Sequence, residues 1–142
     1  MKPARPAGFA VVVCLLVLVA VVTLAYWTTY FTSGATHVRE DEVYLAFENA
    51  FPLADGWMAS CALLAAIGLW RRRPWGFLFG LLTGSSLVYL GCLDVLFNLN
   101  EGTYAIDSGA MGAEIFINVG SLAVGAGLIA WLWRHREALM PR

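Results

Sequence analysis

The chain has 142 residues, of which 60% are hydrophobic and only 13% are charged. This composition excludes an ordinary soluble domain, in which about a quarter of the residues are charged. The formal net charge of −1 does not indicate a nucleic-acid partner, and we expect none. Most of the apolar residues fall into four long runs, which leave no room for a soluble domain beside them.

Each of the four runs is long enough to cross a membrane, which requires about 20 mostly apolar residues for a hydrocarbon core roughly 30 Å thick. We predict spans at about 8–30, 51–70, 75–97 and 109–133. The first run follows a basic start, as in a signal peptide, but it is longer than a signal-peptide core, so we expect a true span. The predicted fold class is therefore an all-α membrane protein: four transmembrane helices in an antiparallel bundle, forming one domain over residues 1–142.

Positive and negative charges lie on opposite sides of these spans. Eight of the nine Lys and Arg residues precede the first span, form the turn at 71–73 or follow the last span, and Arg39 is the exception. Nine of the ten acids lie on the other side or in the adjoining helix ends, and Glu137 is the exception. Because cytoplasmic loops carry the excess of Lys and Arg, we predict that both termini are cytoplasmic, in a bacterial plasma membrane.

The longest connection joins the first two spans on the outer side. The spacing of Val43, Phe47 and Phe51 predicts a short helix that lies at the outer interface and leads into the second span. Pro52 has no N–H to donate to the carbonyl of Glu48. We therefore expect the chain to bend here and to leave that carbonyl free.

Small residues recur at helical spacing in the third span, at Gly76, Gly80 and Gly84, and Gly120 occupies the fourth. In lipid, such residues let helices approach closely, and packing drives their association. We predict that these glycines are helix-packing positions, within the bundle, in a homo-oligomer or in a larger membrane complex.

The outer half of the predicted bundle contains several carboxylates and amides. Asp94 and Asn98 are four residues apart, as are Glu114 and Asn118, so each pair shares a helix face. Three successive helices thus supply polar groups at a similar depth. If these faces point inward, the binding cluster consists of Glu48, Asp55, Asp94, Asn98, Glu114 and Asn118.

A charged acid at the centre of a membrane helix costs roughly 2.5–3.5 kcal/mol, and clustered carboxylates also repel one another. Such a cluster should hold a proton or a cation, and ligands that offer only oxygen favour a hard divalent cation such as Ca²⁺, Mg²⁺ or Mn²⁺. Simpler interpretations remain open: Asp55 and Glu114 cap helix starts, and Arg39 pairs with Asp94. No predicted span contains a histidine and no Gly-rich phosphate loop is present, so we expect neither haem nor a nucleotide.

One segment carries a resemblance. The run Phe47-Glu48-Asn49-Ala50-Phe51-Pro52-Leu53-Ala54-Asp55, followed by Leu93-Asp94, resembles small four-helix bacterial inner-membrane proteins of unassigned function. The resemblance covers most of the chain and implies the same four-helix architecture. It implies no activity.

Three functions remain open from the sequence. The first is a binding or accessory membrane protein whose cluster holds a cation, a proton or a polar head group. The second is a membrane-embedded enzyme that acts on a lipid-like substrate, with Asp55 or Asp94 as the general acid or base. The third is a structural subunit whose glycine-rich helices dock into a larger complex. We favour the first, and with it the absence of enzymatic activity.

Overall fold

The computed structural model describes residues 5–140, so Lys2 and Arg142, which contributed to the predicted charge pattern, lie outside it. All regular elements of the described residues are helical, and none is a strand. In chain order they are α1 (Phe9–Ser33), α2 (Glu42–Glu48), α3 (Pro52–Trp70), α4 (Pro74–Asn100), the short 3₁₀ helix η1 (Thr103–Ala105), α5 (Gly109–Arg134) and α6 (Arg136–Leu139).

Four segments of this structure are long and apolar enough to cross a membrane: α1, α2 together with α3, α4, and α5. The prediction of an all-helical protein with four candidate spans is therefore confirmed. The helix ends follow local signals in the sequence. Pro52 and Pro74 begin α3 and α4, where a missing N–H costs no helical hydrogen bond, and the Ser108 side chain accepts a bond from the Met111 N–H at the start of α5.

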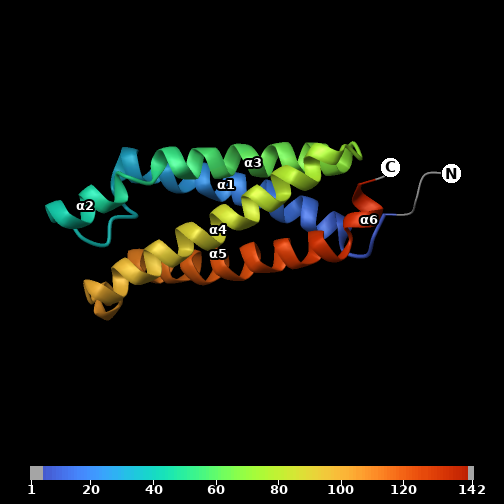
Figure 1. Ribbon diagram of the computed structural model, residues 1–142. Coiled ribbons are helices and arrows are strands. Elements are labelled where there is room, and N and C mark those ends of the chain that lie inside the picture. The colour runs from blue at the N-terminus through green and yellow to red at the C-terminus, as the bar shows by residue number, and fades with distance from the viewer. Residues whose placement is uncertain (1–4, 141–142) are drawn as a thin grey trace.

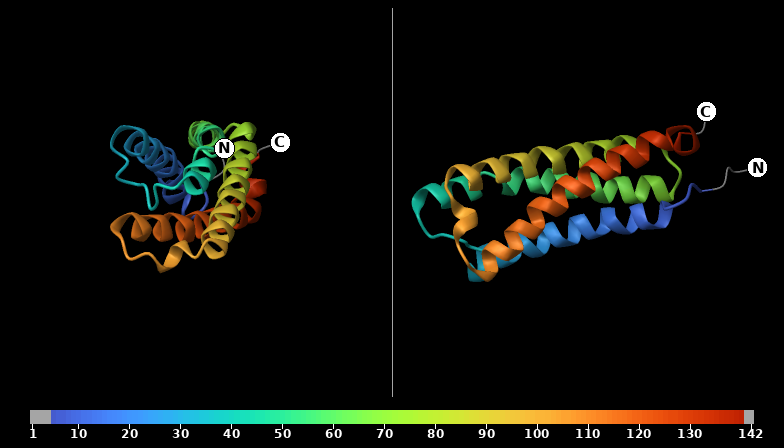
Figure 2. Two further views of the ribbon diagram at one scale, coloured as in Figure 1. Left: turned by 90° about the vertical axis from the view of Figure 1, so that its left-hand side faces the viewer. Right: turned by 90° about the horizontal axis from the view of Figure 1, so that it is seen from below.

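The helices pack in chain order, α1 against α3, α3 against α4 and α4 against α5. Figure 1 shows the start of α1, the α3–α4 turn and α6 at one end of the molecule, which we call the α6 end, and α2 and η1 at the opposite end, the α2 end. α1 and α5 have no extensive direct packing along their lengths. The two views of Figure 2 show the same elongated arrangement from its end and from below.

The α6 end is closely packed. A Cβ atom on Gly76 would lie 2.3 Å from the backbone nitrogen of Leu69, so α3 and α4 touch backbone to backbone at this point. Gly84 and Gly125 allow the same approach between α4 and α5. A hydrophobic cluster around the buried side chains of Leu16 and Leu132 joins α1 to α5 at this end. The closely packed half is therefore the one in which the long helices carry no acid.

Gly80 and Gly120 differ in their surroundings. A Cβ atom on Gly80 would lie 2.7 Å from Leu132, so this glycine, like Gly76 and Gly84, faces a neighbouring helix of the same chain. At Gly120 no atom lies within 4 Å of the Cβ position, and the residue borders a cavity. Its small size leaves space open instead of bringing two helices together, which differs from the role we expected for it.

The connection into α3 corrects two expectations. The chain does break between Glu48 and Pro52, but the carbonyl of Glu48 is not free, because it accepts the N–H of Phe51 at 3.0 Å. The buried face of α2 also differs from the predicted one. Tyr44 is fully buried, whereas Val43 is 57% exposed, because the Tyr44 side of α2 faces the bundle, where its hydroxyl donates to Glu114.

Candidate functional site

Three carboxylates from three different helices meet near the α2 end of the bundle. Glu48 ends α2, Asp94 lies in the last two turns of α4, and Glu114 lies in the second turn of α5. One oxygen atom of each lies within 4.8 Å of the other two. Glu48 and Glu114 are each 5% exposed, and Asp94 is partly buried. We call Glu48, Asp94 and Glu114 the carboxylate cluster.

Short-range features of the sequence place Glu48 in the cluster. The Asp41 side chain caps α2 by accepting the Tyr44 N–H at 3.2 Å. Desolvation raises the pKa of Asp41, but the Tyr44 N–H, the Arg39 guanidinium and the backbone N–H of Asp41 together lower it more, so its net pKa lies below the usual value. Phe47 stacks face to face on Phe97 of α4, with ring centroids 3.8 Å apart. The cap and the stacked pair hold α2 so that its last residue faces inward.

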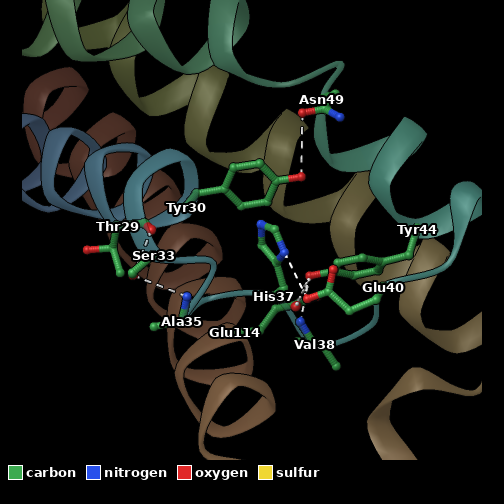
Figure 3. Close-up of polar contacts among 10 residues, drawn as sticks. All are labelled: Thr29, Tyr30, Ser33, Ala35, His37, Val38, Glu40, Tyr44, Asn49 and Glu114. Carbon is green, nitrogen blue, oxygen red and sulfur yellow. Dashed lines mark hydrogen bonds and ion pairs between the residues drawn. The ribbon is translucent and has the colours of Figure 1, made fainter.

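Neutral donors satisfy several oxygen atoms of the cluster. The Tyr26 hydroxyl donates to Glu48 Oε2 at 3.1 Å. Figure 3 shows the Tyr44 hydroxyl near Glu114, to whose Oε2 it donates at 3.3 Å, while the Asn98 amide donates to the other oxygen of Glu114. Phenol and amide groups orient the carboxylates but supply no positive charge.

Asp55 and Asp94 border the same cavity and differ in their partners. The indole N–H of Trp27 donates to Asp55 Oδ2 at 2.8 Å, which ties α1 to α3. The Asp94 carboxylate accepts no hydrogen bond from any residue between 5 and 140, although it faces the cavity. Asp94 is therefore the member of the cluster best able to accept bonds from a ligand.

Arg39 and His37, the basic residues closest to α2 in the sequence, form ion pairs with acids outside the carboxylate cluster. Arg39 lies 2.5 Å from Asp41 and 3.4 Å from Glu101, so the pairing of Arg39 with Asp94 that the sequence left open does not occur. His37 lies 3.1 Å from Glu40 and packs on Tyr30, as Figure 3 shows. Within the described part of the chain, no Lys, Arg or His forms an ion pair with the carboxylate cluster.

Of the two predicted asparagines, Asn98 bonds to a carboxylate of the cluster and Asn118 does not, and neither lines the cavity. Asn98 and Asn118 are almost completely buried, at 0% and 1% exposure. Asn118 donates to the Tyr104 hydroxyl at 3.0 Å, which links α5 to η1. Burial raises the pKa of that hydroxyl, the Asn118 bond opposes this, and the negative charges of Asp94 and Glu114 add to the rise. The Oδ1 atoms of both asparagines have no hydrogen-bond partner, which is costly for a buried acceptor.

A cavity of about 210 Å³ lies beside the cluster. Its wall is mostly apolar and comes from α1, α3, α4 and α5, with Leu15 and Val124 toward the α6 end. The carboxylate cluster, Asp55 and Tyr26 line it toward the α2 end. The cavity therefore has a hydrocarbon-like part and an acidic part.

Every acid of the site was among the residues predicted from the sequence, but none of its aromatic partners was. Tyr44 was missed, although it precedes Glu48 by one helical turn and so shares its face. Tyr26 and Trp27 also carry polar atoms that need partners when they are buried, which could have indicated them. By contrast, Trp57 and Tyr89 are 56% and 64% exposed and do not border the cavity.

The donor set suits a hard cation, since every group that converges on the cluster offers oxygen and no sulfur or imidazole nitrogen is among them. Comparison with known proteins adds nothing to this geometry. No protein-family model matches the chain, and neither the curated proteins nor the solved structures contain a significant match.

Proposed function

We propose that this chain is an integral membrane protein that binds a cation between Glu48, Asp94 and Glu114. One observation carries the proposal: three carboxylates from three helices converge, and no basic side chain of the described residues pairs with them. The neutral donors around them leave the negative charge in place.

The three carboxylates repel one another when all of them are ionised, and Coulomb's law gives the order of magnitude of the repulsion energy. Two unit charges about 4–5 Å apart repel by roughly 3–4 kcal/mol at the effective dielectric constant of about 20 that suits sites near a protein surface. Three ionised carboxylates make three such pairs. This repulsion is comparable to the total stability of many small domains, so a bound cation or bound protons must relieve it.

A divalent ion such as Ca²⁺ fits the chemistry of the donors. Ca²⁺ takes six to eight oxygen ligands at about 2.3–2.6 Å, and carboxylates are its usual charged ligands. Asp94 and Oε1 of Glu48 have no hydrogen-bond donor among the described residues. Glu114 is held by Tyr44 and Asn98, which would fix its direction toward the ion in the way that partners of metal ligands do.

The charge distribution supports the topology that goes with this proposal. Arg71, Arg134 and Arg136 lie toward the α6 end, where the α3–α4 turn and α6 meet (Figure 1). We place this end in the cytoplasm of a bacterial cell and both termini with it, so that the four spans form an antiparallel bundle in the plasma membrane. The carboxylate cluster then lies in the outer half of the membrane.

A second candidate is a membrane-embedded enzyme with Asp55 or Asp94 as general acid or base. The specific support for it is the apolar cavity that borders both carboxylates. The structural-subunit hypothesis has less support, because Gly76, Gly80 and Gly84 already face other helices of the same chain.

The test is thermal unfolding of the protein in dodecyl maltoside with Ca²⁺, Mg²⁺ and Mn²⁺ titrated separately. At about 100 times its Kd, a ligand that binds only the folded state stabilises it by about 2.7 kcal/mol. We expect a saturable stabilisation of this order with at least one ion, and its loss in Asp94→Asn.

Two matched controls separate this effect from nonspecific binding. Asp107→Asn removes an exposed acid outside the cluster, and Glu42→Gln removes an exposed acid from the same helix as Glu48. Both variants should keep the response to the ion. If no ion stabilises the wild type and Asp94→Asn is equally or more stable, the cluster is neutralised by protons and the proposal of a metal-ion site fails.

A further inference from the structure

We propose that the cavity beside the carboxylate cluster binds a single-chain amphiphile with a primary ammonium head. This ligand enters the cavity laterally from the bilayer, between α1 and α5. This inference rests on the proposed function, because it identifies the positively charged group that the cluster holds as the head of an organic cation.

The walls of the cavity indicate its lateral opening. α1 contributes a strip from Leu15 to Trp27, and α5 contributes a strip from Phe116 to Val124. These two helices lack extensive direct packing, although the hydrophobic cluster around Leu16 and Leu132 joins them at the α6 end. The long helices of the described chain pack in the order α1, α3, α4, α5, so α1 and α5 lie at the two ends of this order.

The other sides of the cavity are better covered. At the α2 end, the Phe47–Phe97 stack joins α2 to α4, and the Tyr44–Glu114 bond joins α2 to α5. The connection before α2 is tied to the end of α4 by the 3.4 Å pair between Arg39 and Glu101. A ligand from the bilayer therefore meets its least obstructed path along the α1–α5 side.

Charge selects the head group of this ligand. Four carboxylates line the cavity, Glu48, Asp55, Asp94 and Glu114, whereas no Lys, Arg or His is among its lining residues. An anionic phosphate or carboxylate head would be repelled. A primary ammonium brings three N–H donors and one positive charge.

Acceptors for these donors are present beside the cluster. The Asp94 carboxylate accepts no hydrogen bond from the described residues, and Oε1 of Glu48 is likewise without a donor. Glu48 is only 5% exposed and lines the cavity, whereas Asn98, which holds Glu114, does not line it. A buried acceptor without a donor points to a missing hydrogen-bonding group.

The size and shape of the cavity favour a slender hydrocarbon tail. Its volume of about 210 Å³ is smaller than the roughly 300–1,000 Å³ of pockets for drug-sized ligands. The strip on α1 from Leu15 to Trp27 covers twelve residue steps, or about 18 Å at 1.5 Å per residue. A single alkyl chain fits a narrow space of this length better than a fused ring system does.

The experiment measures thermal unfolding in dodecyl maltoside with dodecylamine as the probe. Its amine is protonated at neutral pH, as a lysine side chain is. Dodecanol has the same tail without the charge, and butylamine has the charge without the long tail. We expect dodecylamine to stabilise the wild type saturably, and each of the other two to have a midpoint at least about tenfold weaker, if head and tail both contribute.

Variants test the two parts of the site separately. Gly120→Leu adds a side chain at a position that borders the cavity and has no atom within 4 Å, so it should block the tail and leave the carboxylates intact. Gly127→Leu is the matched control, since it lies on the same helix, also has open space and does not border the cavity. Asp94→Asn tests the head. We expect Gly120→Leu and Asp94→Asn to weaken the dodecylamine response at least about tenfold, and Gly127→Leu to retain it.

The response to divalent ions separates the two proposals. If Gly120→Leu loses the amine response but keeps the ion response, it is folded and the tail site is supported. If the ions stabilise the wild type and dodecylamine stabilises it no better than dodecanol does, the amphiphile proposal fails while cation binding at the cluster stands. If neither the ions nor dodecylamine act through Asp94, both proposals fail.

Discussion

The two ends of this bundle use opposite packing strategies. Toward the α6 end, glycines bring backbones into contact, and apolar side chains fill much of the remaining space. Toward the α2 end, the helices are joined by hydrogen bonds between side chains, such as Trp27 to Asp55 and Asn98 to Glu114, and a cavity remains between them. Close packing in one half allows the other half to remain open around charged groups.

The difference also suggests how stability and function are divided. A polar network near a cavity is a poor source of stability, because buried charges cost more than neutral hydrogen bonds return. In lipid, however, close backbone contact through small residues is an effective source of stability. Four substitutions, from the largest expected effect to the smallest, test whether the two ends behave in this way.

Gly76→Ala should have the largest effect. Its Cβ atom would lie 2.3 Å from the Leu69 nitrogen and 2.4 Å from the Gly68 carbonyl carbon, and both are backbone atoms that cannot move aside cheaply. We expect a loss of about 3 kcal/mol in the free energy of unfolding, measured by thermal unfolding in detergent. Gly127→Ala, with open space around it, should be neutral or gain up to about 1 kcal/mol from helix propensity. Equal effects at the two sites would contradict close packing at this end.

Tyr44→Phe should have the next largest effect, at the α2 end. The hydroxyl donates to Glu114 at 3.3 Å, and its removal leaves that buried carboxylate oxygen without this donor. We expect a loss of about 1–2 kcal/mol, together with weaker stabilisation by the bound cation. Tyr89→Phe is the control, since Tyr89 is 64% exposed. If Tyr44→Phe matches this control in both measurements, α2 does not organise the site.

Trp27→Phe should cost less, about 1 kcal/mol, which lies within the range measured for hydrogen bonds between membrane helices. It removes the 2.8 Å bond to Asp55 and keeps an aromatic ring against the cavity. Trp57→Phe, at a 56% exposed position, should leave the unfolding temperature unchanged. The α1 connection to the site would be dispensable if both variants unfold at the wild-type temperature.

Arg39→Gln should have the smallest effect, because its ion pairs with Asp41 and Glu101 are partly exposed and screened. The pKa of Asp41 is lowered in the folded protein, so this interaction stabilises above the unfolded pKa and is lost as pH falls through the folded value. The difference in unfolding temperature between wild type and variant should therefore shrink in high salt and at acidic pH. A difference that persists under both conditions would mean that Arg39 contributes through packing instead of charge.

Much of the fold was predictable because it depends on local quantities. The lengths of the apolar runs determine the helices, and the largest boundary difference is three residues, from Tyr30 to Ser33 at the end of α1 and from Phe97 to Asn100 at the end of α4. The i, i+4 spacing of Asp94 with Asn98 likewise puts both residues on one helix face. Local spacing does not say whether the faces of different helices converge.

What the tertiary structure alone decided is how these faces meet. In lipid an apolar residue is equally at home against a neighbouring helix or against hydrocarbon, so hydrophobicity cannot tell the two apart. The sequence by itself therefore determined four helices and the positions of the acids along them. Only the packing decided that Tyr44 is buried while Val43 is not, that Gly120 borders a cavity while Gly84 faces α5, and that Glu48, Asp94 and Glu114 come within 4.8 Å of one another.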